Sequence, residues 1–299
     1  MHKRMVPDFV LEDAAAVHAR LAELYPSGAR ACQALYDAQN YSLLAGGKRI
    51  RPVLVMETCR TLGGDMRIAL DFASAVEMVH TYSLIHDDLP CMDDDDLRRG
   101  RPTNHKVFGE SIALQAGDAL LTDAFVLAAE NPHLSPATNA RAVALLARAA
   151  GSHGMVGGQV LDLMGEQAQT RPDRETLALM HRLKTGALIR VAAMLGALAA
   201  GVPEEDARMS AATAYAEDIG AVFQIVDDIL DVTGDAASLG KTPGSDAVQG
   251  KTTTLSFMSI EEARERAAQL NARACDAIAK YENNEFLIGL AERLLNRHH

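Results

Sequence analysis

Aromatic residues and cysteine are scarce in this chain of 299 residues, which excludes several classes of protein. Tryptophan is absent and aromatic residues make up 4% of the chain, so alanine and leucine must fill most of the core. Such a core suits closely packed helices. The four cysteines stand apart and form no C-x-x-C pair. We therefore expect a reducing compartment, with neither a disulfide framework nor a thiolate zinc site.

Signals for export and membrane insertion are also missing. The N-terminal residues contain no basic stretch that leads into an apolar run, so we expect no signal peptide. The longest apolar run, residues 191–202, is shorter than the roughly 20 residues that cross a bilayer. The sequence therefore predicts a cytoplasmic protein without membrane insertion.

The excess of acidic residues is concentrated in two short segments. The net charge is −11, from 29 basic and 40 acidic residues. Residues 87–96, the first acidic box, contain six aspartates, and residues 227–235, the second acidic box, contain four. Without these ten the net charge would be −11 + 10 = −1. Such a distribution argues against nucleic acid as a partner.

Hydrophobic residues recur with a helical period along nearly the whole chain. In residues 66–86, for example, Val76, Val79 and Tyr82 follow one another at three-residue spacing. Similar patterns predict helices at residues 9–25, 28–44, 51–62, 111–130, 136–150, 154–169, 173–200, 204–232, 250–281 and 284–297. Alternating strands of useful length and low-complexity linkers are absent from the sequence. We therefore predict one all-helical domain over residues 1–299.

The second acidic box has the spacing of a metal site on a helix. Asp227 and Asp231 are four residues apart and share one helix face, where their charges repel unless a cation lies between them. Ile229 and Leu230 argue against a purely solvated face. Oxygen ligands in this arrangement suit Mg²⁺, which usually also contacts substrate phosphates. A helix end that faces solvent is the alternative interpretation.

The first acidic box contains a residue that interrupts a helix. Pro90 lacks a backbone N–H, and its ring crowds the carbonyl group of His86. The chain is therefore expected to kink and fold back, which would bring Asp93 beside Asp87. A calcium-binding EF-hand loop is excluded, because its glycine and its closing glutamate are missing.

Basic residues accompany both acidic boxes. Lys48, Arg49 and Arg51 follow a Gly-Gly pair, and arginines at 98, 99 and 101 follow the first box. Arginine and lysine are the usual partners of phosphate oxygens, although each residue alone could be an ordinary surface charge. The Gly-Lys-Thr triplets at 240–242 and 250–252 lack the earlier glycine of a nucleotide-binding P-loop.

Five segments in order resemble the motifs of trans-prenyl diphosphate synthases. They are residues 46–52 (GGKRIRP), 82–105 (the first aspartate-rich motif), 158–162, 184–186 and 224–231. The resemblance implies the isoprenoid synthase fold, with antiparallel helices around a deep central cavity, and a homodimer. It also implies Mg²⁺ as cofactor, three ions per site once substrate is bound.

The resemblance assigns roles to the residues that match each motif. The implied magnesium ligands are Asp87, Asp93 and Asp227, supported by Asp88 and Asp231. The residues implied to hold the allylic diphosphate are Arg98, Lys184 and Lys241. Those implied to hold isopentenyl diphosphate are Lys48, Arg51, His80 and Arg99.

The implied reaction is a magnesium-dependent, head-to-tail (1′-4) condensation. An allylic diphosphate such as dimethylallyl or geranyl diphosphate ionises as Mg²⁺ neutralises the leaving group, and isopentenyl diphosphate attacks the resulting cation. Thr185 and Gln224 would place neutral dipoles beside that cation. The alternatives are a terpene cyclase, which the basic cluster at residues 48–51 disfavours, and an inactive partner subunit, which two complete acidic boxes disfavour.

Product length depends on the floor of the cavity. Tyr82 lies five residues before Asp87, roughly 7.5 Å along a helix, and its ring could form that floor. Geometry leaves the choice open, because Ser83 shares the face of Asp87 more nearly and Tyr82 could simply be a core residue. An aromatic residue here, together with the two-residue insertion at residues 90–91, most resembles bacterial farnesyl diphosphate synthases. We therefore expect farnesyl diphosphate as the product, with geranylgeranyl diphosphate as the alternative.

Overall fold

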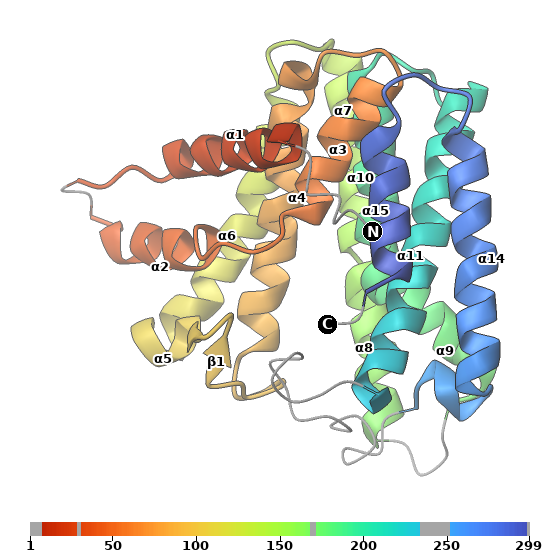
Figure 1. Cartoon of the computed structure of the whole chain (residues 1–299). Coiled ribbons are helices and arrows are strands. Elements are labelled where there is room, and N and C mark those ends of the chain that lie inside the picture. Colours follow the sequence, from red (N-terminus) through yellow and green to blue (C-terminus); the bar gives the residue numbers. More distant parts are fainter. Residues whose placement is uncertain (1–7, 29–30, 168–171, 234–251, 298–299) are drawn as a thin grey trace.

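The computed structural model describes residues 8–28, 31–167, 172–233 and 252–297, and these form a helical bundle (Figure 1). The α-helices are α1 (Asp8–Leu24), α2 (Gln33–Leu43), α3 (Ile50–Thr61), α4 (Met66–Asp87), α5 (Asn104–Phe108), α6 (Glu110–Ala129), α7 (Pro136–Ala150), α8 (Met155–Gln167), α9 (Arg174–His181), α10 (Ala187–Ala199), α11 (Ala207–Thr233), α14 (Ile260–Ile278) and α15 (Glu285–Leu295). A π-helical turn, η1 (Arg182–Gly186), joins α9 to α10, and a 3₁₀ turn, η2 (Thr254–Ser256), precedes α14. The predicted all-helical class is confirmed.

Three local features differ from the sequence prediction. A small antiparallel hairpin follows the first acidic box, with Leu97 of β1 (Leu97–Arg98) opposite Pro102 of β2 (Arg101–Pro102). The helix predicted over residues 173–200 is divided by η1. The helix predicted from residue 250 begins only at Ile260, where Ser259 and Glu262 form a capping box that satisfies the first backbone N–H groups.

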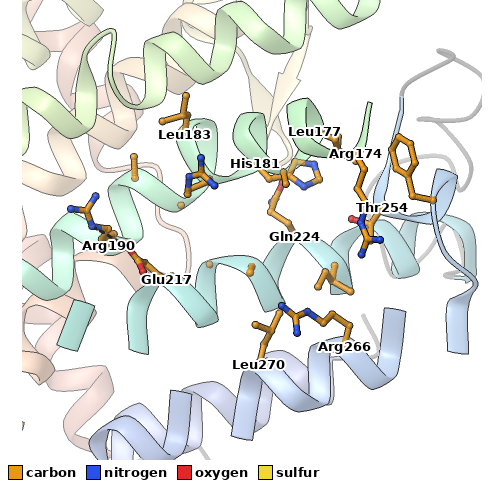
Figure 2. A pocket seen from close by; sticks show the side chains of 18 of the residues that line it. Arg174, Leu177, His181, Leu183, Arg190, Glu217, Gln224, Thr254, Arg266 and Leu270 are labelled. Atoms are coloured by element: carbon orange, nitrogen blue, oxygen red, sulfur yellow. Dashed lines mark ion pairs between the residues drawn. The ribbon is translucent and has the colours of Figure 1, made fainter. Parts of the chain in front are cut away.

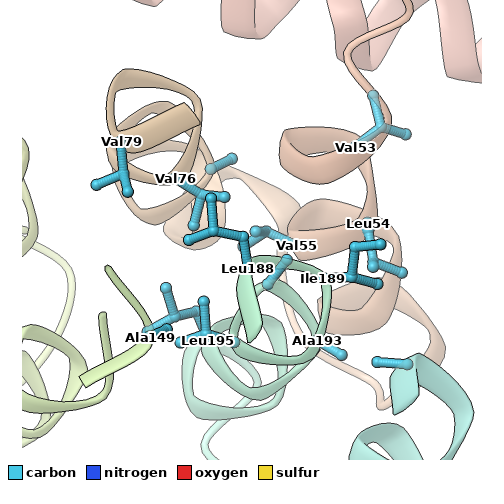
Figure 3. Close-up of a cluster of buried hydrophobic side chains, with 14 of the residues drawn as sticks. Val53, Leu54, Val55, Val76, Val79, Ala149, Leu188, Ile189, Ala193 and Leu195 are labelled. Atoms are coloured by element: carbon cyan, nitrogen blue, oxygen red, sulfur yellow. The ribbon is translucent and has the colours of Figure 1, made fainter. Parts of the chain in front are cut away.

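The core lies where α3, α4 and α10 meet (Figure 3). Val55 of α3, Val76 of α4 and Leu195 of α10 are all fully buried there. Gly196 allows α3 and α10 to approach closely, because a Cβ atom at this position would lie 2.3 Å from the carbonyl oxygen of Val55. Tight packing of this kind fixes α4 and η1, which carry much of the site described below.

Helix α6 packs against α4 (Figure 1), and its outer side carries exposed apolar residues. Its buried residues include Ala113, Ala116 and Leu120, whereas Leu114 and Val126 are 42% and 49% exposed. By length and composition alone α6 could cross a membrane, although such a test is also passed by core helices of other proteins. These exposed side chains leave one face of α6 without a packing partner among the residues that the structure describes.

Candidate active site

A cavity of about 590 Å³ brings together the segments that the sequence singled out. It lies between α4, α8, η1 and α11, and the C-terminal Arg297 also reaches it. Its lining includes most of the predicted substrate-binding residues and the predicted ligands of the second acidic box: Arg51, His80, Arg98, Lys184, Thr185, Gln224, Asp227 and Asp231. The predicted Lys241 lies outside the described residues.

The first acidic box folds back as Pro90 predicts. The backbone N–H of Asp93 donates to the carbonyl oxygen of Asp87 at 2.9 Å, which places the two residues side by side despite their six-residue separation. Asp94 adopts a left-handed backbone conformation, with φ of 51°, to complete the turn. The predicted proximity of Asp87 and Asp93 is therefore confirmed.

The carboxyl group of Asp87 lies in an environment that lacks enough positive charge. Burial is the main cause that raises its pKa to about 6, and the charges of Asp93 and Asp88 raise it further. Lys184 and Arg98 act in the opposite direction but do not compensate fully. A bound divalent cation would relieve this cost, so the residues fit Mg²⁺.

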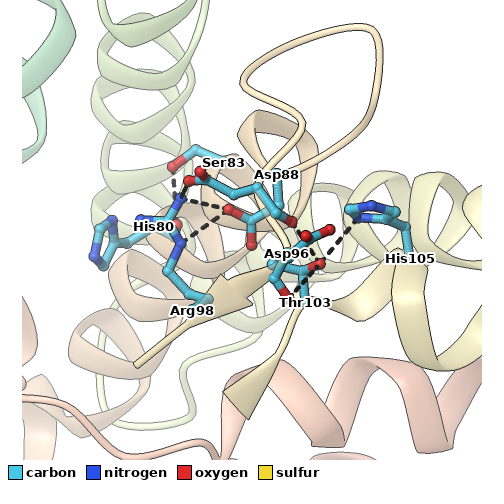
Figure 4. A network of polar contacts seen from close by, with 8 residues as sticks. His80, Ser83, Asp88, Asp96, Arg98, Thr103 and His105 are labelled. Atoms are coloured by element: carbon cyan, nitrogen blue, oxygen red, sulfur yellow. Dashed lines mark hydrogen bonds and ion pairs between the residues drawn. The ribbon is translucent and has the colours of Figure 1, made fainter. Parts of the chain in front are cut away.

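The carboxylate of Asp88 pairs with an arginine of the site. Its side chain is nearly buried and accepts a hydrogen bond from Nε of Arg98 at 2.9 Å, together with a second, shorter contact from Nη2 (Figure 4). Arg98 also pairs with Asp95 at 2.9 Å. Asp88 therefore orients the arginine that lines the cavity, and its supporting role at the metal stays a prediction.

The aspartates of the second acidic box also face different surroundings. Asp227 and Asp231 line the cavity, as their shared helix face predicts. Asp228 is buried, and its Oδ2 accepts a hydrogen bond from the backbone N–H of Thr254 at 2.7 Å. Arg297 donates from Nη1 to Oδ1 of Asp227 at 2.5 Å, a contact that no motif indicated. Arg297, which follows α15, is therefore part of the site.

Neither box forms a complete metal site by itself. Within the described ranges, no group of three or more His, Cys, Asp or Glu side chains is arranged to hold a metal ion. Mg²⁺ is usually bound by one or two carboxylates, waters and substrate phosphates, so a few carboxylates from each box are sufficient. Asp87 with Asp93, and Asp227 with Asp231, are the pairs that could contribute.

Beside the boxes lies a pocket wall with several guanidinium groups. Arg51 has a buried Nε atom without a hydrogen-bond partner, and burial lowers its pKa, with Arg99 adding to the effect. His80 is held neutral, because burial and the charges of Arg51 and Arg99 lower its pKa well below the usual value. An unsatisfied buried donor in such surroundings favours an anion.

The Gly46-Gly47 pair lets the guanidinium group of Arg99 lie directly against the backbone. A Cβ atom at Gly47 would lie 2.7 Å from Cζ of Arg99, whose Nη1 donates to the carbonyl oxygen of Gly46. Gly47 itself has a φ of 115°, a conformation that side chains rarely adopt. The side chain of Lys48, next to Gly47, is largely exposed; its partial burial, followed by the charge of Arg297, lowers its pKa.

Arg49 belongs to the same basic cluster in the sequence but does not face the cavity. It forms a buried ion pair with Glu77 of α4, and its Nη2 donates to the carbonyl oxygen of Leu43 at 2.6 Å. The argument that this cluster favours condensation therefore rests on Lys48 and Arg51, together with Arg99.

The π-helical turn η1 positions Lys184 and Thr185. A Cβ atom at Gly158 would lie 2.2 Å from the backbone nitrogen of Lys184, so only glycine lets α8 approach this turn. Asp162, one turn along α8, accepts a hydrogen bond from Nζ of Lys184 at 2.5 Å. Isolated π turns often mark functional sites. The structure thereby explains the spacing of Gly158 and Asp162 in the sequence.

Tyr82 and Ser83 do not line the described cavity. The Tyr82 ring is nearly buried and packs edge-on against His86, with the centroids 5.6 Å apart. Burial, followed by the charge of Asp87, raises the pKa of Tyr82 to about 12, and its hydroxyl group has no hydrogen-bond partner. Ser83 donates to the carbonyl oxygen of His80 at 2.9 Å. Their effect on product length stays a prediction.

Comparisons with known proteins match this geometry. Residues 32–285 match the model of the family described as polyprenyl synthetase. A heterodimeric geranylgeranyl pyrophosphate synthase large subunit from Arabidopsis thaliana is 46% identical over 88% of this chain and 72% of its own length. An FPP/GFPP synthase from Zymomonas mobilis has a TM-score of 0.86 at 36% identity, covering 96% of this chain and 98% of that one. A geranylgeranyl pyrophosphate synthetase from Pyrococcus horikoshii has a TM-score of 0.87 at 30% identity, covering 97% and 98%.

Proposed function

Because the chain belongs to the polyprenyl synthetase family of prenyltransferases, we propose that it condenses isopentenyl diphosphate with allylic diphosphates in the presence of Mg²⁺. The observation that carries the proposal is one cavity with carboxylates on α11 and guanidinium groups from three other segments, at Arg51, Arg98 and Arg297. Two anionic substrates need two cationic regions, whereas a terpene cyclase needs only one. Incubation with Mg²⁺ and both diphosphates should release inorganic diphosphate, and neither substrate alone should do so.

The side chains divide the work between them. Asp87, Asp93 and Asp227 would hold Mg²⁺, which when bound neutralises the diphosphate leaving group. Lys184 is held in place by Asp162, and its positive charge acts on the carboxyl group of Asp87. Thr185 and Gln224 line the wall and offer neutral dipoles to the allylic cation. The departing diphosphate is the base that we propose for the last proton.

For the product, we propose geranylgeranyl diphosphate, the alternative in the sequence analysis, over farnesyl diphosphate. Relatives that are 46% identical are named geranylgeranyl pyrophosphate synthases, and the Tyr82 ring does not reach the cavity that would be shortened. Mass spectrometry of the reaction products should show a twenty-carbon chain as the main species. A fifteen-carbon main product that becomes longer in Tyr82→Ala would instead support the floor that the sequence predicts.

Arg51 provides a test of the pocket for isopentenyl diphosphate. We expect Arg51→Ala to raise the KM for isopentenyl diphosphate about 10- to 100-fold, since a charge-assisted hydrogen bond contributes about 1.5–3 kcal/mol. The KM for the allylic substrate should change much less. The control is Arg67→Ala, which removes an exposed arginine of α4 that pairs with Asp65. An effect confined to the allylic substrate would show that the two pockets are assigned the wrong way round.

We also propose that two copies associate through the outer face of α6. The support is the family resemblance and the exposed apolar side chains of Leu114 and Val126. Leu114→Glu with Val126→Glu should convert a dimer into a monomer in sedimentation velocity experiments, because burial of two carboxylates is costly. Val156→Glu with Val160→Glu, exposed residues of α8, serves as a matched control. A wild-type chain that sediments as a monomer at micromolar concentration would refute the proposal.

A further inference from the structure

A second cavity lies behind the wall of the proposed active site. It measures about 450 Å³ and is bounded by α9, η1, α10, α11 and α14 (Figure 2). Leu177, His181 and Gln224 line both cavities, so these side chains form the partition between them. Pockets that bind small molecules typically measure about 300–1,000 Å³, so this cavity is large enough for a ligand. None of its cationic side chains has a part in the mechanism above.

The floor of this second cavity is apolar. Leu183 and Ala187 face it from one side, Ala221 and Ile225 from α11, and Leu270 from α14. Leu270 is nearly buried, and Ala221 presents only a methyl group. A surface of this kind gains free energy when an apolar chain displaces water from it.

Arginines from four different elements surround the apolar floor. They are Arg174 of α9, Arg182 of η1, Arg190 of α10 and Arg266 of α14. Glu217 is the one carboxylate among the described lining residues, and it pairs with Arg190 at 3.3 Å. Within the described part of the chain, Arg182 and Arg266 make no hydrogen bond or ion pair. Arg174 acts electrostatically on Glu262 of α14, whose pKa is lowered mainly by hydrogen bonds with Ser259 and to a smaller extent by this arginine. This cationic rim is unusual in a chain whose net charge is −11.

We propose that the second cavity binds a prenyl diphosphate as a non-catalytic ligand. The apolar floor would hold the prenyl chain, and guanidinium groups would hold the diphosphate, for which their forked geometry is well suited. A purely inorganic anion would leave the apolar floor unused, and a neutral lipid would leave the arginines unused. The choice of a prenyl chain rests on the proposed function, which supplies such molecules to the site; the need for an amphiphilic anion rests on the cavity alone.

Equilibrium dialysis with radiolabelled farnesyl diphosphate in EDTA tests the proposal. Removal of Mg²⁺ should weaken binding of the diphosphate between the two acidic boxes. The second cavity has no acidic box, so its arginines should hold the diphosphate without a metal ion. We expect one metal-independent site per chain. Arg174→Ala combined with Arg266→Ala should weaken that binding at least about tenfold, because two charge-assisted contacts are lost. Arg264→Ala, an exposed arginine of α14 outside the lining, should bind like wild type.

A second pair of variants tests the apolar floor. Ala221→Phe places a ring in the cavity and should abolish binding of the prenyl chain, whereas Ala214→Phe, on an exposed part of α11, should not. Circular dichroism verifies that each variant is folded. Competition by an excess of inorganic diphosphate should be weak, because that anion makes no use of the floor.

Several outcomes would overturn the proposal. The first is that farnesyl diphosphate does not bind without a metal ion. The second is that binding survives the Arg174 and Arg266 substitutions. The third is that binding is lost in Arg51→Ala with Arg99→Ala, which would place the ligand in the active site. Arginine-dependent sedimentation with phosphatidylglycerol vesicles, without binding of soluble farnesyl diphosphate, would assign the surface to a membrane instead. Turnover is measured separately, so an active enzyme without a second site refutes this inference alone, whereas an inactive protein that still binds refutes the proposed function.

Discussion

Substitution of Asp87 or Asp227 by asparagine should reduce turnover by roughly a hundred- to a thousandfold while the fold is retained. The expected size follows from a metal ion that stabilises developing diphosphate charge by several kcal/mol. Each substitution preserves the side-chain volume but removes a negative charge from its acidic box. Steady-state turnover at saturating Mg²⁺ and substrate, together with the thermal unfolding midpoint, separates lost chemistry from lost structure.

Asp96→Asn provides the matched control for these variants. Asp96 belongs to the first acidic box but is exposed and pairs with Lys106 at 2.7 Å, so its loss should leave turnover nearly unchanged. Near-normal turnover in Asp87→Asn or Asp227→Asn would refute the assignment of the metal ligands. An equally large loss in Asp96→Asn would show that total charge matters rather than position.

The pKa of Asp87 adds a pH dependence to the same experiment. Burial raises this pKa to about 6, so below that pH a proton competes with Mg²⁺ for the carboxyl group. The apparent affinity for Mg²⁺ should therefore fall between pH 7.5 and pH 5.5, and the fall should be smaller in Asp87→Asn. Titration calorimetry with a non-reactive allylic diphosphate analogue would measure it at each pH.

The long helices and the position of the site could be predicted from the sequence. Helical periodicity marks α4 and α11 over most of their lengths, and Pro90 predicts the turn that joins Asp87 to Asp93. The division of α9 from α10 could not be predicted, because one π turn shifts the hydrophobic pattern by a single residue. This turn packs closely against α8, where only glycine at position 158 leaves room for the backbone of Lys184.

The roles of adjacent charged residues could not be predicted from the motifs. Neighbouring positions on a helix point about 100° apart, so Asp227 can face the cavity while Asp228 accepts a hydrogen bond from Thr254. The partners of Asp88 and Arg49 are 10 and 28 residues away in the sequence. Only the packing of the helices selects these partners, which is why both residues were grouped with their functional neighbours.

The ion pair between Arg49 and Glu77 should contribute more to stability than any surface pair. Only 4% of the Arg49 side chain and 2% of the Glu77 side chain are exposed. Removal of one partner leaves an uncompensated buried charge, which typically costs about 3–5 kcal/mol. Glu77 also acts on two arginines of the site: burial lowers the pKa values of Arg51 and Arg99, and the charge of Glu77 opposes this shift. We therefore expect Arg49→Met to lower the free energy of unfolding by about 3–5 kcal/mol.

A double-mutant cycle separates the interaction between Arg49 and Glu77 from the packing contribution of each side chain. Arg49→Met with Glu77→Gln should cost less than the sum of the two single substitutions, because no uncompensated charge from the pair remains. Arg67→Ala is the matched control, because it removes the exposed pair with Asp65 but keeps the Asp65 side chain that caps α4, and it should leave the unfolding midpoint nearly unchanged. Chemical denaturation monitored by circular dichroism supplies the free energies. Additive effects of the Arg49 and Glu77 substitutions would show that the two side chains are not coupled, and would refute the stabilising role of the ion pair.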